Sequence, residues 1–186
     1  MRRSILVLGM LTAVAAVGCA DEGDEPGFSP PPTPTGALTA SPSPSPTTET
    51  HVVRVFFGAP DAAETECAEV VPVERTTEGA DVLHDAMEAL LEGPTRDERA
   101  QGIGSFFGAK TRGMLNAVRI EDGVARVDFR DFSQVIPNAS TSCGSAALLA
   151  QLDATATQFP TVREARYSFE GSEEAFYEWL QMSVPT

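Results

Sequence analysis

The chain has 186 residues, of which 42 % are hydrophobic and 22 % charged, and its formal net charge is −14. This length allows one ordinary domain and additional segments, and the apolar fraction is too high for a wholly disordered acidic chain. The acidic balance argues against nucleic acid as a partner, because each phosphate would approach a repulsive field.

Residues 1–18 have the pattern of a bacterial signal peptide. Arg2 and Arg3 precede an apolar run over residues 5–17. This run is shorter than the ~20 residues of a membrane-spanning helix and fits the apolar region of an export signal. The segment Ala16-Val17-Gly18-Cys19 resembles a lipobox, which implies cleavage before Cys19 and attachment of acyl chains such as palmitate to that residue. Ordinary secretion, with Cys19 incidental, is the alternative.

The charge of the cleaved chain supports this anchor. Without residues 1–18, the chain keeps 11 basic and 27 acidic residues, a net charge of −16. Such a chain is repelled by an anionic bilayer, so a lipid on Cys19 is favoured over a polybasic anchor. The expected location is the extracytoplasmic face of the cell membrane.

Residues 19–51 are predicted to be a disordered tether. Eight of the 14 prolines lie between residues 21 and 50, where Ser and Thr fill most other positions. This composition cannot bury enough apolar surface to offset its ordering entropy, and it favours an extended spacer. At ~3.1 Å per residue, thirty residues of polyproline II reach roughly 90 Å. A glycosylated stalk is compatible with the same role.

Residues 52–186 are predicted to form one globular domain. Alternating apolar residues favour a strand over residues 52–57, and a second strand over residues 70–76 contains Pro72, which is typical of a sheet edge. Residues 80–92 carry an apolar stripe at helical spacing, and Gly93 and Pro94 end this helix. Thr95 and Glu98 then form a capping box for a short helix.

A β-hairpin is predicted over residues 117–129. Asp122 and Gly123 lie between two apolar-alternating segments, and this dipeptide favours a type I′ turn, in which both residues have positive φ. The turn pairs Ile120 with Ala125 and places residue 118 opposite residue 127. All four of these apolar side chains then lie on one face of the hairpin.

The C-terminal part adds a helix over residues 145–159, a strand over residues 162–169 and a last helix capped by Ser172. The whole order is β, β, α, β, β, α, β, α. This order predicts an α+β fold, with helices packed on one face of a largely antiparallel sheet and a central β-hairpin.

Five segments in this order resemble a known family. They are Val53-Arg54-Val55-Phe56-Phe57, Val71-Pro72-Val73-Glu74-Arg75, Ala86-Met87-Glu88-Ala89-Leu90-Leu91-Glu92-Gly93-Pro94-Thr95, the hairpin over residues 118–129, and Gln158-Phe159-Pro160-Thr161-Val162. Together they resemble the GerMN domain, the sporulation and spore-germination module of bacterial envelope lipoproteins, over roughly residues 52–171. Residues 106–113 depart from the family's Ile-Pro-x-Gly-Thr turn, and the last helix is an addition.

The resemblance implies a non-catalytic domain without a cofactor, outside the cytoplasmic membrane. It is associated with envelope or cortex assembly, germination and envelope signalling. The implied partners are an envelope protein or a cell-wall polymer, and self-association is also conceivable for this fold.

Few residues suggest other chemistry. Cys67 and Cys143 are a natural disulfide pair in an exported domain, although two free thiols are the alternative. His84 and Glu88 could be half of a metal site, but two ligands do not make one, and a surface charge pair is favoured. Ser142 or Ser145 could be matched with His84 and an Asp in a triad, yet no Gly-x-Ser-x-Gly elbow is present. No catalytic or metal-binding residue is therefore predicted.

Two functional hypotheses remain. The first is a membrane-anchored, non-catalytic binding or scaffold module of the cell envelope. The alternative is a periplasmic enzyme or small-ligand-binding protein that acts on cell-wall material. An enzyme should have a cleft with convergent polar groups and a perturbed acid or base, whereas a scaffold should have an open binding surface.

Overall fold

A computed structural model describes residues 50–60 and 66–186 of the chain. The predicted signal peptide and nearly all of the predicted tether lie outside these residues. The elements follow in the order β1 (Thr50–Gly58), β2 (Val70–Glu78), α1 (Val82–Glu92), α2 (Arg96–Ala100), β3 (Leu115–Glu121), β4 (Val124–Phe129), α3 (Ser142–Ala156), β5 (Glu164–Phe169) and α4 (Glu173–Trp179). This order confirms the α+β prediction.

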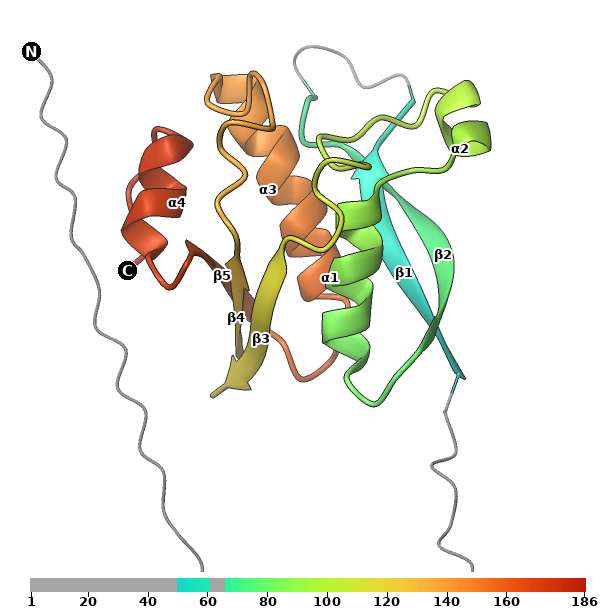
Figure 1. The fold of residues 1–186 in the computed structure, drawn as a ribbon, viewed down its shortest axis with the longest axis horizontal. Helices are drawn as coiled ribbons and strands as arrows, with labels where there is room; N and C mark the ends of the chain where they lie inside the picture. Colours follow the sequence, from blue (N-terminus) through green and yellow to red (C-terminus); the bar gives the residue numbers. More distant parts are fainter. Residues whose placement is uncertain (1–49, 61–65) are drawn as a thin grey trace, which may run out of the picture. The chain divides into compact units, whose positions relative to one another are not determined.

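The strands form two sheets. β1 and β2 pair in antiparallel fashion, and a second sheet has the order β3-β4-β5. Within it β3 and β4 form the predicted hairpin, whereas β5 runs parallel to β4. A parallel pair requires a crossover connection, which here contains α3. Figure 1 shows α1 and α3 side by side, with the two sheets on either side of them.

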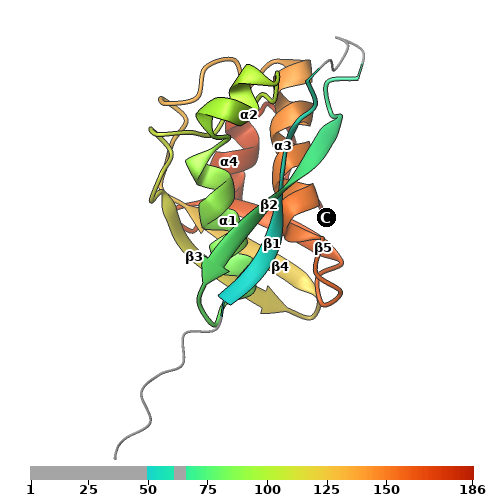
Figure 2. The ribbon, with the colours of Figure 1, turned by 90° about the vertical axis from the view of Figure 1, so that its right-hand side faces the viewer.

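The core lies between these helices and the two sheets. In Figure 2 the β1–β2 pair is nearest the viewer, and α1 and α3 lie behind it. α1 contributes residues of its predicted apolar stripe to this core, and among them Met87 and Leu90 are 0 % exposed. α4 packs against β5 of the three-stranded sheet. There the buried Phe176 stacks near Phe129, with ring centroids 6.2 Å apart. The added C-terminal helix is thus part of the core.

The end of α1 is fixed by a glycine and a threonine. Gly93 has φ 76°, and a Cβ there would lie 2.3 Å from the carbonyl oxygen of Phe107. The buried Thr111 hydroxyl donates a hydrogen bond of 2.7 Å to the carbonyl oxygen of Leu91. Residues 106–113 therefore pack on the helix end, and Phe107 lies in the core at 4 % exposure.

The hairpin turn is the one predicted. Asp122 and Gly123 have φ values of 51° and 82°, and Ile120 pairs with Ala125. Ala125 is fully buried, but Ile120, next to the turn, is 44 % exposed. The register is confirmed, and the burial of this face decreases from the central strand β4 to the edge strand β3.

Some element boundaries differ from the sequence predictions. α3 begins at Ser142 rather than at residue 145, because Thr141 accepts a hydrogen bond from the backbone N–H of Gly144 and caps the helix three residues earlier. β1 begins at Thr50, two residues before the predicted start of the domain. Thr95 and Ser172 cap α2 and α4 as expected.

The outer edge of β1 is covered by the end of α3. The Gln158 side-chain amide accepts a hydrogen bond from the backbone N–H of Arg54 at 3.1 Å and donates one to its carbonyl oxygen at 2.6 Å. Thr155 accepts a third from the N–H of Phe56. One amide side chain thus substitutes for a neighbouring strand, which explains the glutamine in the Gln-Phe-Pro segment. Pro72 lies in β2, which among the described strands pairs only with β1, as an edge strand should.

Candidate functional site

The outer face of the three-stranded sheet carries a row of arginines. Since Ala125 and Val127 point into the core, the intervening Arg126 points outward. The antiparallel register places Arg119 opposite Arg126, and the parallel register places Arg166 on the other side of Arg126. We call these three residues the arginine row.

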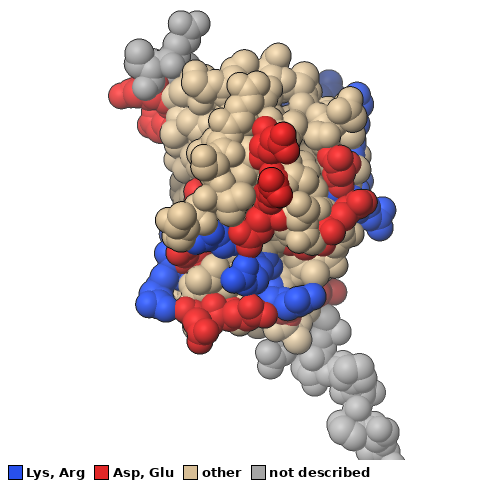
Figure 3. Space-filling view, turned by 90° about the vertical axis from the view of Figure 1, so that its left-hand side faces the viewer, with Lys and Arg blue, Asp and Glu red and all other residues tan. Residues whose placement is uncertain are grey.

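Two further rows flank the arginine row on the same face. Their members follow from the same registers and are, on one side, Glu121, Val124 and Glu164 and, on the other, Ala117, Asp128 and Ser168. In Figure 3 basic side chains gather on the lower part of this face, with an acidic band below them and further acidic side chains above. The face therefore alternates in charge across short distances.

Ion pairs engage two members of the arginine row. Arg126 contacts Glu121 at 3.2 Å and Glu173 at 2.8 Å, and Arg166 contacts Glu164 at 2.5 Å. The hydrogen bond to Glu164 raises the pKa of Arg166 above its already high value, so this guanidinium stays charged. The exposed Arg119 makes no ion pair with any described side chain.

A shallow hollow of about 210 Å³ lies beside the arginine row. The three arginines line it, together with Asp128, Glu173 and the small residues Ala117, Ser168 and Gly171. Asp128 is held there by hydrogen bonds from the Ser168 hydroxyl at 2.6 Å and the Gly171 N–H at 2.7 Å. These hydrogen bonds fix the Asp128 carboxylate against the sheet, so the guanidiniums are the groups left to act on a ligand.

The arginines of this face are side chains that can bind oxyanions. Like charges directly opposite each other on neighbouring strands destabilise a sheet, so three aligned arginines are unfavourable for stability alone. A guanidinium presents several donors in a planar fork that matches carboxylate and phosphate groups.

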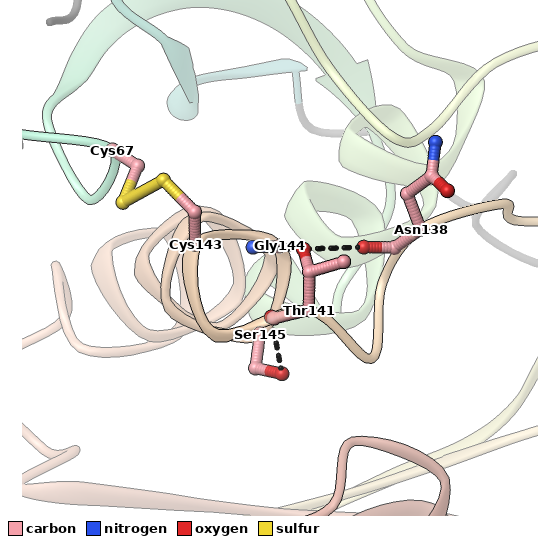
Figure 4. The surroundings of a disulfide bond; sticks show 6 residues. All are labelled: Cys67, Asn138, Thr141, Cys143, Gly144 and Ser145. Carbon is pink, nitrogen blue, oxygen red and sulfur yellow. Dashed lines mark hydrogen bonds between the residues drawn. A yellow bond between two sulfur atoms is a disulfide. The ribbon is translucent and has the colours of Figure 1, made fainter. Parts of the chain in front are cut away.

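The two cysteines predicted to pair are joined in the structure by a disulfide, with Cα atoms 5.6 Å apart (Figure 4). Cys67 precedes β2, and Cys143 lies in the first turn of α3. Gly144 follows it because a Cβ there would lie 2.1 Å from the carbonyl oxygen of Asn138. Cys19, the predicted lipid attachment site, lies outside the described residues.

The other residues considered from sequence are held in structural contacts. Ser145 is 5 % exposed, and its hydroxyl lies 2.9 Å from the carbonyl oxygens of both Ala139 and Leu180. His84 lies 3.6 Å from the carboxylate of Asp85. Within residues 50–60 and 66–186, no three His, Cys, Asp or Glu side chains are grouped closely enough to hold a metal ion.

One tyrosine–aspartate pair was not foreseen. The Tyr167 hydroxyl donates a 2.7 Å hydrogen bond to Asp153. Burial raises the pKa of Tyr167 well above its usual value, so the hydroxyl remains a donor. The bond links β5 to α3.

The family of the chain follows from its sequence. The family model for sporulation and spore germination, named Germane, matches residues 54–175. The chain belongs to the Germane family. No curated protein gives a significant match.

Two solved structures resemble this Germane chain in fold. The tandem GerMN domains of the sporulation protein GerM from Bacillus subtilis are 20 % identical, with a TM-score of 0.46 over 73 % of this chain and 43 % of that one. A candidate lipoprotein from Clostridium perfringens is 18 % identical, with a TM-score of 0.40 over 66 % of this chain and 76 % of that one. The chain thus spans less than half of the GerM structure. None of its described helices has the length and apolar character needed to cross a bilayer.

Sequence reasoning missed the arginine row for a definite reason. The hairpin prediction already placed Arg119 opposite Arg126, and the alternation in the next strand placed Arg166 on a polar face. The parallel register of β5 on β4, which aligns all three, depends on a crossover of more than thirty residues. No local pattern specifies that register.

Proposed function

We propose that this protein is a lipid-anchored extracytoplasmic lipoprotein. Its Germane domain would act as a non-catalytic binding module in cell-envelope assembly, sporulation and germination, or envelope signalling. The observation that carries this proposal is the arginine row, because the exposed residues Arg119 and Arg126 lie on a sheet face that none of the described helices covers.

The opposite face of the same sheet explains why the outer face is available for binding. The inward residues of β4 and β5, such as Val127 and Phe169, are buried under the helices and supply the core. The outward residues contribute little to that core, so the core does not require these charged side chains. A binding surface of this kind needs neither a nucleophile nor a cofactor.

The membrane anchor is tested by labelling cells with a fatty acid. The lipobox-like segment before Cys19 supports acylation there. Label is expected on the wild-type protein and is expected to be absent from Cys19→Ala. An unlabelled wild type, or label that persists in the variant, would contradict the anchor.

The binding role is tested by photo-crosslinking in cells. A photoreactive residue replaces Ala117, which lines the hollow, or, as a control, the exposed Glu88 on α1. Crosslinked products are expected from position 117 and not from position 88. Equal products from both positions, no product from either, or turnover of wall fragments by the purified chain would argue against a non-catalytic module with this binding face.

A further inference from the structure

The arginine row places three guanidiniums side by side across three strands of an acidic protein, although Arg126 and Arg166 also pair with carboxylates of the same face. We infer that this row binds the phosphate groups of a linear anionic polymer that lies across β3, β4 and β5. The inference rests on the proposed binding function and names the class of partner. Its physical basis is the alignment of Arg119, Arg126 and Arg166 by two strand registers.

The spacing of the row suits phosphate. Neighbouring strands are ~4.8 Å apart, so the three Cα positions span about 10 Å. A planar carboxylate is satisfied by the fork of one guanidinium, whereas a phosphate group offers oxygens in several directions and can bridge arginines on adjacent strands. Arg119 and Arg126 are such a pair of direct neighbours.

The borders of the row favour a chain-like ligand over a compact one. The row crosses the whole sheet, from the edge strand β3 to the edge strand β5, so a polymer can enter at one edge and leave at the other. Glu121 and Glu164 border one side of it, and Glu173 borders the other. These carboxylates repel a polyanion from the flanking positions and confine it to the row.

Three carboxylates, Glu121, Glu164 and Glu173, compete with the ligand for the arginines, and among them Glu173 contacts both Arg126 and Arg166. Its carboxylate lies 2.8 Å from Arg126 and 3.9 Å from Arg166, and so it occupies donors that a phosphate would use. Arg119 has no such competitor among the described side chains and can make the first contact. Removal of the Glu173 charge should therefore strengthen binding, whereas removal of an arginine should weaken it.

The test measures the affinity of the full chain, purified in an uncharged detergent, for a poly(glycerol phosphate) oligomer. The double substitution Arg119→Gln with Arg126→Gln should weaken binding at least tenfold, because two charge-assisted contacts are lost. Glu173→Gln should tighten binding several-fold. Arg112→Gln is the matched control, since it removes an exposed arginine that pairs with Glu92 away from the row.

Further probes distinguish a phosphate polymer from free phosphate, an anionic lipid surface and a carboxylate polymer. Inorganic phosphate, phosphatidylglycerol vesicles and polyglutamate are titrated in parallel, and each should bind at least tenfold more weakly than the oligomer. Equal affinity for any of them overturns the assignment to a phosphate polymer, as does equal loss in the Arg112→Gln control. Thermal unfolding curves confirm that the variants fold, and the opposite sign expected for Glu173→Gln does not depend on destabilisation.

The failure of this inference can be told from failure of the proposed function. If a protein is crosslinked from position 117 but poly(glycerol phosphate) does not bind, the proposed binding function stands and the inferred polymer ligand is wrong. Absence of both overturns the module as well.

Discussion

The two sheets of this domain use arginine in opposite ways. On the two-stranded sheet, Arg75 donates hydrogen bonds of 2.8 and 2.7 Å to the two oxygens of Glu98, and its guanidinium lies 5.6 Å from the ring centre of Phe57. On the three-stranded sheet, Arg119 and Arg126 lie opposite each other with their charges toward solvent. Arg75 joins β2 to α2 and Arg126 reaches Glu173 at the start of α4, whereas Arg119 makes no ion pair with any described side chain.

The two sheets also differ in how far their outer edge or face is covered. The edge of β1 is closed by Gln158, and the segment before β2 is tied to α3 by a disulfide. The outer face of β3-β4-β5 has no comparable cover among the described elements. The contacts of Arg75, Gln158 and the disulfide thus tie the first sheet and its neighbouring segments to the helices, whereas the outer face of the second sheet carries the arginine row. Four tests by substitution probe this division.

The largest effect is expected from the disulfide. Replacing Cys67 and Cys143 with Ser opens a covalent loop with a sequence separation of 76 residues. The chain-entropy model predicts a loss of about 4 kcal/mol in the free energy of unfolding. Urea unfolding measures this loss. Wild type in reductant should match the variant, and a wild type that carries two alkylatable thiols without reduction would contradict the bridge.

The next effect concerns the edge of β1. Gln158→Leu leaves the N–H and carbonyl groups of Arg54 without their side-chain partner, at a cost of roughly 2 kcal/mol. Thermal unfolding measures the change. Gln134→Leu, at an exposed position, is the matched control and should be nearly neutral. Equal effects of the two substitutions would mean that edge closure contributes nothing.

A smaller loss, of about 1–2 kcal/mol, is expected for Glu98→Gln. The hydrogen bonds from Arg75 lower the pKa of Glu98 below its ordinary value of 4.5. The ionised carboxylate therefore stabilises the folded state above pH 4.5, and this contribution is lost as the pH falls through the lower folded-state pKa.

Unfolding measured from pH 7 to pH 2 checks this sign. The stability gap between wild type and Glu98→Gln should narrow as the solution becomes more acidic. Asp97→Asn changes a neighbouring exposed carboxylate and serves as the control. A gap that stays constant over this range would show that the charge of Glu98 is unimportant.

The smallest effect is expected in the arginine row. Arg119→Gln should change the free energy of unfolding by no more than about 0.5 kcal/mol and could stabilise the domain, because it relieves repulsion from Arg126. Arg75→Gln, the same substitution on the first sheet, should cost about 1–2 kcal/mol. A loss above 1 kcal/mol for Arg119→Gln would erase the distinction between the two sheets.

Much of the fold was predictable because its signals are local. The Asp122-Gly123 turn follows from the backbone conformations that these two residues tolerate, and the end of α1 at Gly93 has the same origin. The capping residues Thr95 and Ser172 act on N–H groups within one helical turn. The start of α3 was misplaced because Thr141 offered a capping signal that the apolar stripe did not reveal.

The candidate site was predictable only in part. Alternation places Arg126 and Arg166 on polar faces of their strands, but it does not say which strands are neighbours.

The sequence by itself therefore determined the order of elements, the caps, the hairpin register and the membership of the Germane family. Only the tertiary structure decided that the strands divide into two sheets, that Gln158 closes the edge of β1, and that Arg166 aligns with Arg126. The physical reason is the range of the interactions. Turns and caps are set by bonds between residues a few positions apart, whereas the arginine row depends on how a distant strand packs against the shared core.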